Sequence, residues 1–446
     1  MLKKIIAFST FLLTGIFTTA QQNVYSPYSR YAFGELNTSA LTHYMGMGSA
    51  SIGLADSTLL NYNNPATYCY IVRHKPIFDM AATGLRITAR TTDASEQSYA
   101  GGLKNIVLGF PLTRRWGMGI GLIPFSSVGY HIRQTIDEPN IGNVEYVYYG
   151  GGGINKVFLG NGVEIIKTTR NKLSVGLNSS YVFGTISRER KAYYPSVSYL
   201  NSRIISNKVV NDFAFDAGLY YKGQINTNNW FSLGATYGFS SKINAREEFF
   251  SHTFENTGYA EYIKDTIQYV DSTKGYISLP RKIGYGIAWE LRDSVDGRAY
   301  SKTIISLQYE TQDWKYYTEV FGNDTVSDFL KNSSMFSLGI QFIPYISHTA
   351  GKINFWKRMN YRLGARYYTT YLSMNETQLK QYGISFGLGI PLLHSASSSM
   401  LNFSVEGGKR GTDANGLIEE KYLNFNVGIS VTPHRTEGWF FKRKYD

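Results

Sequence analysis

Residues 45–68 read MGMGSASIGLADSTLLNYNNPATY, and this stretch decides how the rest of the chain is interpreted. Its first half holds mostly small residues, and its second half ends in Asn64-Pro65-Ala66. The stretch shows neither the period of an amphipathic helix nor the alternation of a strand. Because backbones approach closely where side chains are missing, such a segment can pack tightly inside a larger structure. We interpret it as a plug; the alternative is a glycine-rich surface loop.

Residues 1–20 have the features of a secretory signal peptide. Lys3 and Lys4 precede an apolar run from Ile5 to Phe17, and small residues up to Ala20 offer a cleavage site. The run is too short to span a bilayer as a helix, and no later segment is apolar enough to do so. The sequence therefore predicts an exported protein that is either soluble or a β-barrel.

From about residue 77 to the end, the sequence consists of segments in which apolar and polar residues alternate, and this pattern predicts strands. In the last segment, Leu423, Phe425 and Val427 share one face, whereas Asn424 and Asn426 share the other. We count about 14 such segments. They lie near residues 77–91, 102–112, 116–134, 143–167, 172–190, 208–223, 229–249, 274–292, 300–316, 334–348, 358–373, 379–393, 399–411 and 416–432.

The connections between these segments alternate in length, as in outer-membrane barrels with long extracellular loops and short periplasmic turns. The sequence therefore predicts an all-β fold, an antiparallel transmembrane barrel of about 14 strands formed by residues 77–446. Residues 21–76 are expected to be an N-terminal lead and a plug in the lumen. A soluble multi-domain β protein is the alternative, because its strands alternate too. Long connections are predicted at residues 190–207, 250–273 and 317–333.

The composition suits a barrel wall and argues against several other classes of protein. The 36 Tyr and 44 Gly residues are typical of barrel walls and interface girdles. The net charge of +12 is not concentrated on one helix or interleaved with aromatic residues, so nucleic acid is not an expected partner. Cys69 has no second cysteine to pair with, and the seven His residues are scattered. We therefore expect no disulfide framework, metal or cofactor.

Several motifs resemble the long-chain fatty-acid transporter (FadL-like) family, in the divergent form of Bacteroidetes-type outer membranes. Residues 48–50, 55–57 and 64–66 are similar to the family's N-terminal hatch, and residues 116–126 resemble its third strand. The resemblance covers the chain from about residue 45 and implies a barrel plugged by its own N-terminus. It also implies passive uptake of hydrophobic molecules, with escape through a side opening. The lead at residues 21–44 is longer than the family's hatch requires, and the chain does not end in Phe.

The candidate hatch and gating residues are Gly48, Asp56, Asn64, Pro65 and Ala66. Proline fixes φ, and an asparagine side chain can bond to nearby backbone. We therefore expect Asn64 and Pro65 to hold the plug in the position that gates the lumen.

Strand three carries a second candidate feature, because Pro124 falls well inside the segment at residues 116–134. Proline cannot donate a ladder hydrogen bond, so it should mark a break in pairing, and Gly119 and Gly121 would let the backbone bend. The hypothesis is an inward kink that opens a lateral port. An ordinary bulge without an opening is the alternative.

Four charged residues fall on the polar faces of their strands: Glu310, Arg362, Arg366 and Glu406. A charge on the lipid face costs about 2–4 kcal/mol at the bilayer midplane, so these side chains should point into the lumen. They either contact a substrate or hydrogen-bond to the plug and fix it. We favour the second interpretation because buried charges require partners.

The sequence is compatible with two functions. The first is passive uptake of an unidentified hydrophobic small molecule across the outer membrane, with outer-membrane lipid as the other partner. The second is a structural or accessory barrel subunit of an outer-membrane assembly or secretion complex. An enzyme is not expected, because the nucleophile-elbow pattern at residues 383–387 lies within a strand-like run instead of a strand-to-helix turn.

Overall fold

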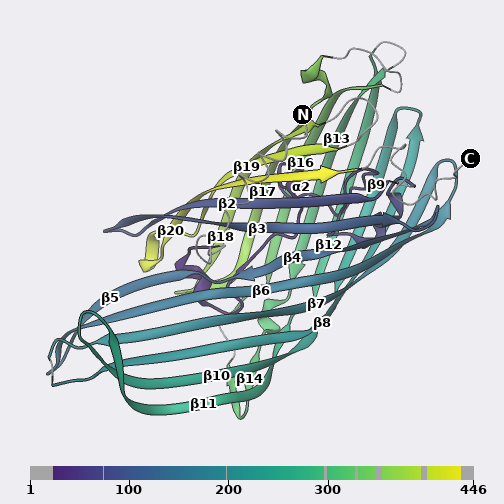
Figure 1. The fold of residues 1–446 in the computed structure, drawn as a ribbon. Coiled ribbons are helices and arrows are strands. Elements are labelled where there is room, and N and C mark those ends of the chain that lie inside the picture. Colours follow the sequence, from purple (N-terminus) through teal and green to yellow (C-terminus); the bar gives the residue numbers. More distant parts are fainter. Residues whose placement is uncertain are drawn as a thin grey trace, which may run out of the picture.

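The computed structural model describes residues 24–432, except 74, 197, 296–298, 327–329, 348–353 and 393–398. The described chain is mainly antiparallel strand, closed into a barrel of 14 strands (Figure 1). The first wall strand pairs with the last, from Phe78 with Val431 to Arg90 with Glu419, and this pairing closes the barrel. The predicted fold class is therefore confirmed.

The wall strands follow one another round the barrel in chain order. They are β2 (Ile77–Arg90), β3 (Ser95–Pro111), β4 (Trp116–Ser127), β6 (Gly142–Lys167), β7 (Asn171–Tyr193), β8 (Asn201–Asn226), β9 (Asn229–Gly238), β12 (Lys282–Ser294), β13 (Ala299–Gln312), β16 (Ser333–Ser347), β17 (Asn360–Met374), β18 (Thr377–Pro391), β19 (Met400–Arg410) and β20 (Glu419–Val431). Their alternation places side chains such as Leu307, Leu363 and Ile384 on the exposed outer surface.

Part of the wall extends beyond the rest as a raised sheet. β5 (Tyr130–Glu138) continues β4, β10 (Ser241–Asn256) continues β9, and β11 (Glu261–Leu279) leads into β12. The raised sheet has the order β5-β6-β7-β8-β10-β11. In Figure 1 these strands extend to the lower left, well past β2 and β3.

The raised sheet corrects two of the predicted loops. Residues 190–207 and 250–273 are mostly strand, and the connections between strands shorten to 194–200 and 257–260. A strand that leaves the bilayer no longer needs an apolar lipid-facing side, so it loses the alternation by which strands are recognised. Part of the third predicted loop is also strand, as the hairpin of β14 (Glu319–Phe321) and β15 (Asp324–Val326).

Residues 24–71, which we call the N-terminal segment, lie inside the barrel and are mostly buried. Their regular structure is limited to the two-residue strand β1 (Glu35–Leu36) and to short helices. The short helices among the described residues are η1 (Pro27–Arg30), α2 (Thr42–Met45), η2 (Pro65–Tyr70), η3 (Trp314–Tyr316), η4 (Phe355–Arg358) and η5 (Ala414–Gly416). Among the described residues, no helix is long and apolar enough to cross a membrane.

Glycines of the wall let the N-terminal segment pack directly against the strand backbones. A Cβ atom at Gly364 would overlap the backbone of Gly48, and one at Gly234 would overlap the backbone of Ile52. Glycine thus permits a close approach that any larger residue would prevent. The same relation holds for Gly117, Gly162, Gly176, Gly286, Gly339 and Gly387, whereas a Cβ at Gly218 would overlap the side chains of Asn64 and Pro65. We call these seven positions, with Gly234 and Gly364, the glycine belt.

Candidate functional site

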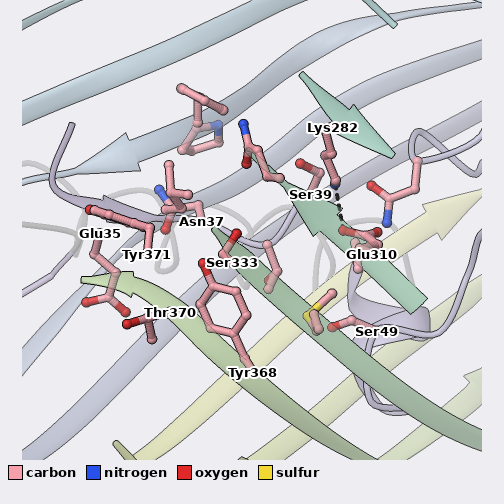
Figure 2. Close-up of a pocket in the computed structure, with 18 of the residues that line it drawn as sticks. Glu35, Asn37, Ser39, Ser49, Lys282, Glu310, Ser333, Tyr368, Thr370 and Tyr371 are labelled. Atoms are coloured by element: carbon pink, nitrogen blue, oxygen red, sulfur yellow. Dashed lines mark ion pairs between the residues drawn. The ribbon is translucent and has the colours of Figure 1, made fainter. Parts of the chain in front are cut away.

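The interior of the barrel contains a cavity of about 250 Å³. Its lining includes residues 35–40 and Ser49, Tyr62 and Asn63, so two parts of the N-terminal segment border it. Wall strands complete the lining. Figure 2 shows Glu35, Asn37 and Ser39 among the lining side chains, together with the ion pair between Lys282 and Glu310. The cavity is therefore bordered by polar and charged groups as well as by apolar ones.

Glu310 acts on the N-terminal segment through a neighbouring side chain. Its carboxylate lies 2.7 Å from Lys282 Nζ and accepts a hydrogen bond from Gln308 Nε2 at 2.9 Å. The Gln308 Oε1 atom in turn accepts from the backbone N–H groups of Ser51 and Ile52, at 2.7 and 2.9 Å. Two backbone donors of an irregular segment are thereby satisfied inside the barrel.

The other three predicted lumen charges bond to neighbouring wall residues. Arg366 donates to Glu406, with nitrogen–oxygen distances of 2.7 and 2.8 Å. Arg362 is 1% exposed and donates to Gln341 at 2.8 Å and to Asn402 at 3.0 Å. These bonds connect β16, β17 and β19 across the inner face of the wall. The structure therefore brings Arg366 and Glu406 together, whereas Arg362 donates to the neutral side chains of Gln341 and Asn402.

The predicted gating residues lie where the N-terminal segment meets the wall. Asn64 donates through Nδ2 to the carbonyls of Ile52 and Leu219, at 2.9 and 3.1 Å. Its Oδ1 accepts from the N–H of Ala66 at 3.2 Å, which caps η2, and Pro65 begins that helix. Asn64 therefore connects two parts of the N-terminal segment to β8.

The remaining two predicted hatch residues have different roles. The Gly48 N–H donates to the Ser385 hydroxyl at 2.9 Å, so the serine of the rejected nucleophile-elbow pattern is an anchor for this segment. The Asp56 carboxylate accepts from the N–H and hydroxyl of Thr58, both at 2.8 Å. Asp56 therefore stabilises a local turn and bonds to its own segment instead of the wall.

Residues 24–37 hold a second set of anchors that sequence reasoning missed, since this part was expected to be an irregular lead. Phe33 is fully buried and lies edge-on to the rings of Phe125, Trp314 and Tyr317. Glu35 accepts from Arg410 at 2.9 Å. The many aromatic residues at positions 25–33 could have indicated that this part is buried, because large aromatic side chains gain most from burial.

Strand pairing changes at the predicted kink. β3 pairs with β4 only as far as Ile106 with Leu122, and β4 has an irregularity in its pairing with β6 between Pro124 and Ser126. Beyond this point β1 pairs with β4, at Ser126 and Ser127. β3 and β5 diverge in Figure 1. The cavity lining includes Pro124 and Leu103, on either side of this separation.

The two glycines before Pro124 contact different groups. A Cβ at Gly119 would come within 3.1 Å of the Tyr68 ring, so this glycine makes room for the N-terminal segment. A Cβ at Gly121 would come within 2.5 Å of the Ile106 carbonyl, on the neighbouring strand β3. Gly119 therefore belongs to the packing of the N-terminal segment, whereas Gly121 belongs to the packing of the wall.

Burial keeps two titratable groups of the N-terminal segment uncharged at neutral pH. It lowers the pKa of His43 well below its ordinary value, and the nearby Arg362 guanidinium lowers it further. Burial also raises the pKa of the Cys69 thiol to about 11. Within the described part of the chain, no three His, Cys, Asp or Glu side chains lie close enough together to hold a metal ion.

Comparisons with solved structures show the fold. The CymD monoaromatic hydrocarbon channel superposes with a TM-score of 0.52 at 11% identity, covering 90% of this chain and 99% of that one. The toluene transporter TbuX of Ralstonia pickettii gives 0.51 at 11% identity, with coverages of 89% and 100%. A FadL homologue of Pseudomonas aeruginosa gives 0.51 at 12% identity, with coverages of 89% and 98%. These neighbours are channels and transporters, not enzymes.

The comparison by sequence gives a different family. No curated protein matches the chain. A family model described as BamG matches residues 1–446, the whole length of the sequence. The low identities to the FadL-type barrels place those proteins at the level of a shared fold. By its full-length match, this chain belongs to the BamG family.

Proposed function

We propose that this protein is an outer-membrane β-barrel that serves as a structural subunit of an outer-membrane protein assembly complex. The observation that carries the proposal is the filling of the barrel by its own N-terminal segment on both sides of the cavity. On one side Phe33 and Glu35 are anchored, and on the other Ser51, Ile52 and Asn64 are bonded to the wall. The match to BamG also hints at an assembly role.

The contacts of residues 24–37 favour a permanent fit over a passage for solutes. Arg410 donates to both Glu35 and Glu420, and Ser26 donates to Glu420. Arg188 also donates to the carbonyl of Ala32. Opening this side would break the Glu35–Arg410 ion pair and the bonds made by Ser26 and Ala32, and it would expose the buried ring of Phe33. Such a barrel is suited to hold a fixed shape within a larger complex.

The placement in the outer membrane rests on three observations. The sequence begins with a signal peptide pattern, and its strands close into a barrel through the pairing of β2 with β20. Apolar side chains such as Leu307, Leu363 and Ile384 are exposed on the outside. Long extensions lie outside the cell in this class of barrel, so we orient the raised sheet toward the extracellular side.

Purification from native outer membranes in a mild detergent tests the structural role. An affinity tag in the exposed turn at residues 92–94 leaves both ends of the chain unchanged. We expect the protein to elute with other outer-membrane proteins in fixed stoichiometry, and its deletion to lower the amount of folded barrels in the membrane. Elution as a monomer, with normal levels of other barrels in the deletion strain, would argue against the proposal.

Passive uptake of hydrophobic small molecules is the second candidate, and the separation of β3 from β4 beside the cavity favours it. On this proposal, Pro124 maintains a lateral route into the bilayer. Pro124→Val should restore pairing and slow uptake of a fluorescent hydrophobic probe several-fold. Pro391→Val, at the end of β18, is the matched control and should have no effect. If cells lacking the protein take up the probe at the normal rate, this candidate fails.

A further inference from the structure

The raised sheet ends in a long strand with one free edge. β11 pairs along one side with β10, from Leu279 to Glu261. On its other side, among the described residues, β11 pairs only with β14, at Gly275, Tyr276 and Ile277. Within the described part of the chain, no strand covers the other side of residues 261–273, which we call the β11 edge. Backbone donors and acceptors along this edge therefore face solvent.

The side chains of the β11 edge are unusually apolar for a solvent-exposed strand. Tyr262, Ile263, Ile267 and Tyr269 are between 57% and 64% exposed. Natural proteins usually shorten, cover or charge such edges, because an exposed apolar edge strand templates pairing with another chain. A long strand that carries four large exposed hydrophobic side chains fits a surface that is covered in the working protein.

The charge of this region identifies the kind of occupant. Residues 255–271 contain four acidic side chains (Glu255, Glu261, Asp265 and Asp271) and one basic side chain, Lys264. Glu255 pairs with Lys264, and Glu261 pairs with Lys191 and Arg203, which leaves Asp265 and Asp271 as the acidic side chains of this region without an ion pair among the described residues. The β11 edge is therefore acidic, although the whole chain has a net charge of +12. Pairing of two β11 edges from two copies of this chain would bring like charges together, which destabilises a sheet. A basic strand from a different protein is complementary to this edge.

We propose that the β11 edge binds an extended, basic strand of another outer-membrane protein by adding it to the raised sheet. Backbone hydrogen bonds would supply affinity in this mode, and alternate side chains would supply specificity. Ile263 and Ile267 offer apolar contacts, and Asp265 and Asp271 offer charged ones. This inference rests on the proposed role as a complex subunit and names the surface through which that role operates.

Amide hydrogen exchange of the natively purified complex tests the inference. The same chain refolded alone in detergent is the reference. In the complex, we expect amides of residues 261–273 to exchange at least about tenfold more slowly than in the isolated barrel. Unchanged exchange at these amides within an intact complex would overturn this inference alone. Protection at residues 130–138 instead, on the opposite edge of the raised sheet, would overturn it too.

A matched pair of variants separates a docking role from a structural one. Ile267→Lys should reduce the co-purified subunits several-fold, because it places a positive charge against a basic strand. Ile136→Lys on β5 should leave them unchanged, and both side chains are exposed on the raised sheet. Heat-modifiable migration in gels checks that each barrel is folded. Equal yields of complex from both variants would contradict the inference. A wild-type protein that purifies alone would instead contradict the proposed function on which the inference rests.

Discussion

Arg366 and Glu406 illustrate what a charged pair inside a barrel contributes. Both side chains are nearly buried, and Tyr422 also donates to the carboxylate at 2.7 Å. Glu406→Gln would leave the guanidinium without its counter-charge, so the free energy of unfolding should fall by about 3–5 kcal/mol. Urea unfolding in lipid vesicles measures this loss.

The pair also supplies its own controls. The double variant Arg366→Met with Glu406→Gln should recover part of the lost stability, because neither charge is then buried alone. Lys264→Met breaks the exposed ion pair with Glu255 and should change the stability little. A Glu406→Gln variant as stable as the wild type would show that the pair adds nothing.

Gly364 and Gly84 provide a test of the glycine belt. A Cβ at Gly364 would overlap the backbone of Met47 and Gly48, whereas nothing lies within 4 Å of a Cβ at Gly84. Gly364→Ala should therefore destabilise the protein by about 1–3 kcal/mol through overpacking. Gly84→Ala should stay within about 0.5 kcal/mol of the wild type. Equal unfolding midpoints in urea would mean that the N-terminal segment does not pack against the wall as described.

At the level of single residues, alternation predicts on which face of a strand a side chain lies, but it does not predict which residues that side chain contacts. Alternation alone placed Glu310, Arg366 and Glu406 on the polar faces of their strands, because the period of a strand is fixed. It could not reveal that Arg366 meets Glu406 across β18, since this contact depends on the register of three strands. The importance of Phe33 was missed for the same reason, because its aromatic partners lie far away in the chain.

Among the elements, the N-terminal segment is predicted to obstruct the lumen, whether as a permanent filling or as a gate. Asn64→Ala combined with Pro65→Ala removes the bonds to Ile52 and Leu219 and the fixed φ at the start of η2. We expect the conductance in planar bilayers to rise several-fold. Asn228→Ala, in the turn between β8 and β9, is the control. Unchanged conductance in a folded double variant would count against gating by this element.

The wall strands were predictable from the sequence because a lipid-facing surface imposes strict alternation on them. The predicted segments at residues 334–348 and 379–393 match β16 and β18 within two residues. The starts of β8 and β11 were missed because residues 201–207 and 261–273 belong to the raised sheet, where neither face must be apolar. Where the bilayer no longer constrains a strand, its sequence loses the pattern.

For the whole molecule, the orientation in the membrane is open to a direct test. Thr92 lies in the exposed turn between β2 and β3, and Arg114 lies in the exposed turn between β3 and β4, at the opposite end of the barrel. In intact cells, a membrane-impermeant maleimide should label Thr92→Cys strongly and Arg114→Cys very weakly. The opposite pattern would mean that the proposed orientation is inverted.

Cys69 makes this labelling experiment simple to interpret. Its thiol pKa of about 11 leaves almost no thiolate at neutral pH, and the thiolate is the form that reacts. The wild-type protein should therefore remain unlabelled below about pH 9, and Cys69→Ala removes any residual signal. Rapid labelling of the wild type at neutral pH would mean that Cys69 is more accessible than its burial implies.

The glycine belt has a consequence for the order of events during biogenesis. Residues 24–71 contact wall strands from β4 to β18. The closed barrel therefore leaves no space through which the N-terminal segment could enter after closure. The seam between β2 and β20 must therefore close around a segment that is already in position. Variants in which the N-terminal segment cannot take up this position should therefore fail to insert as folded barrels.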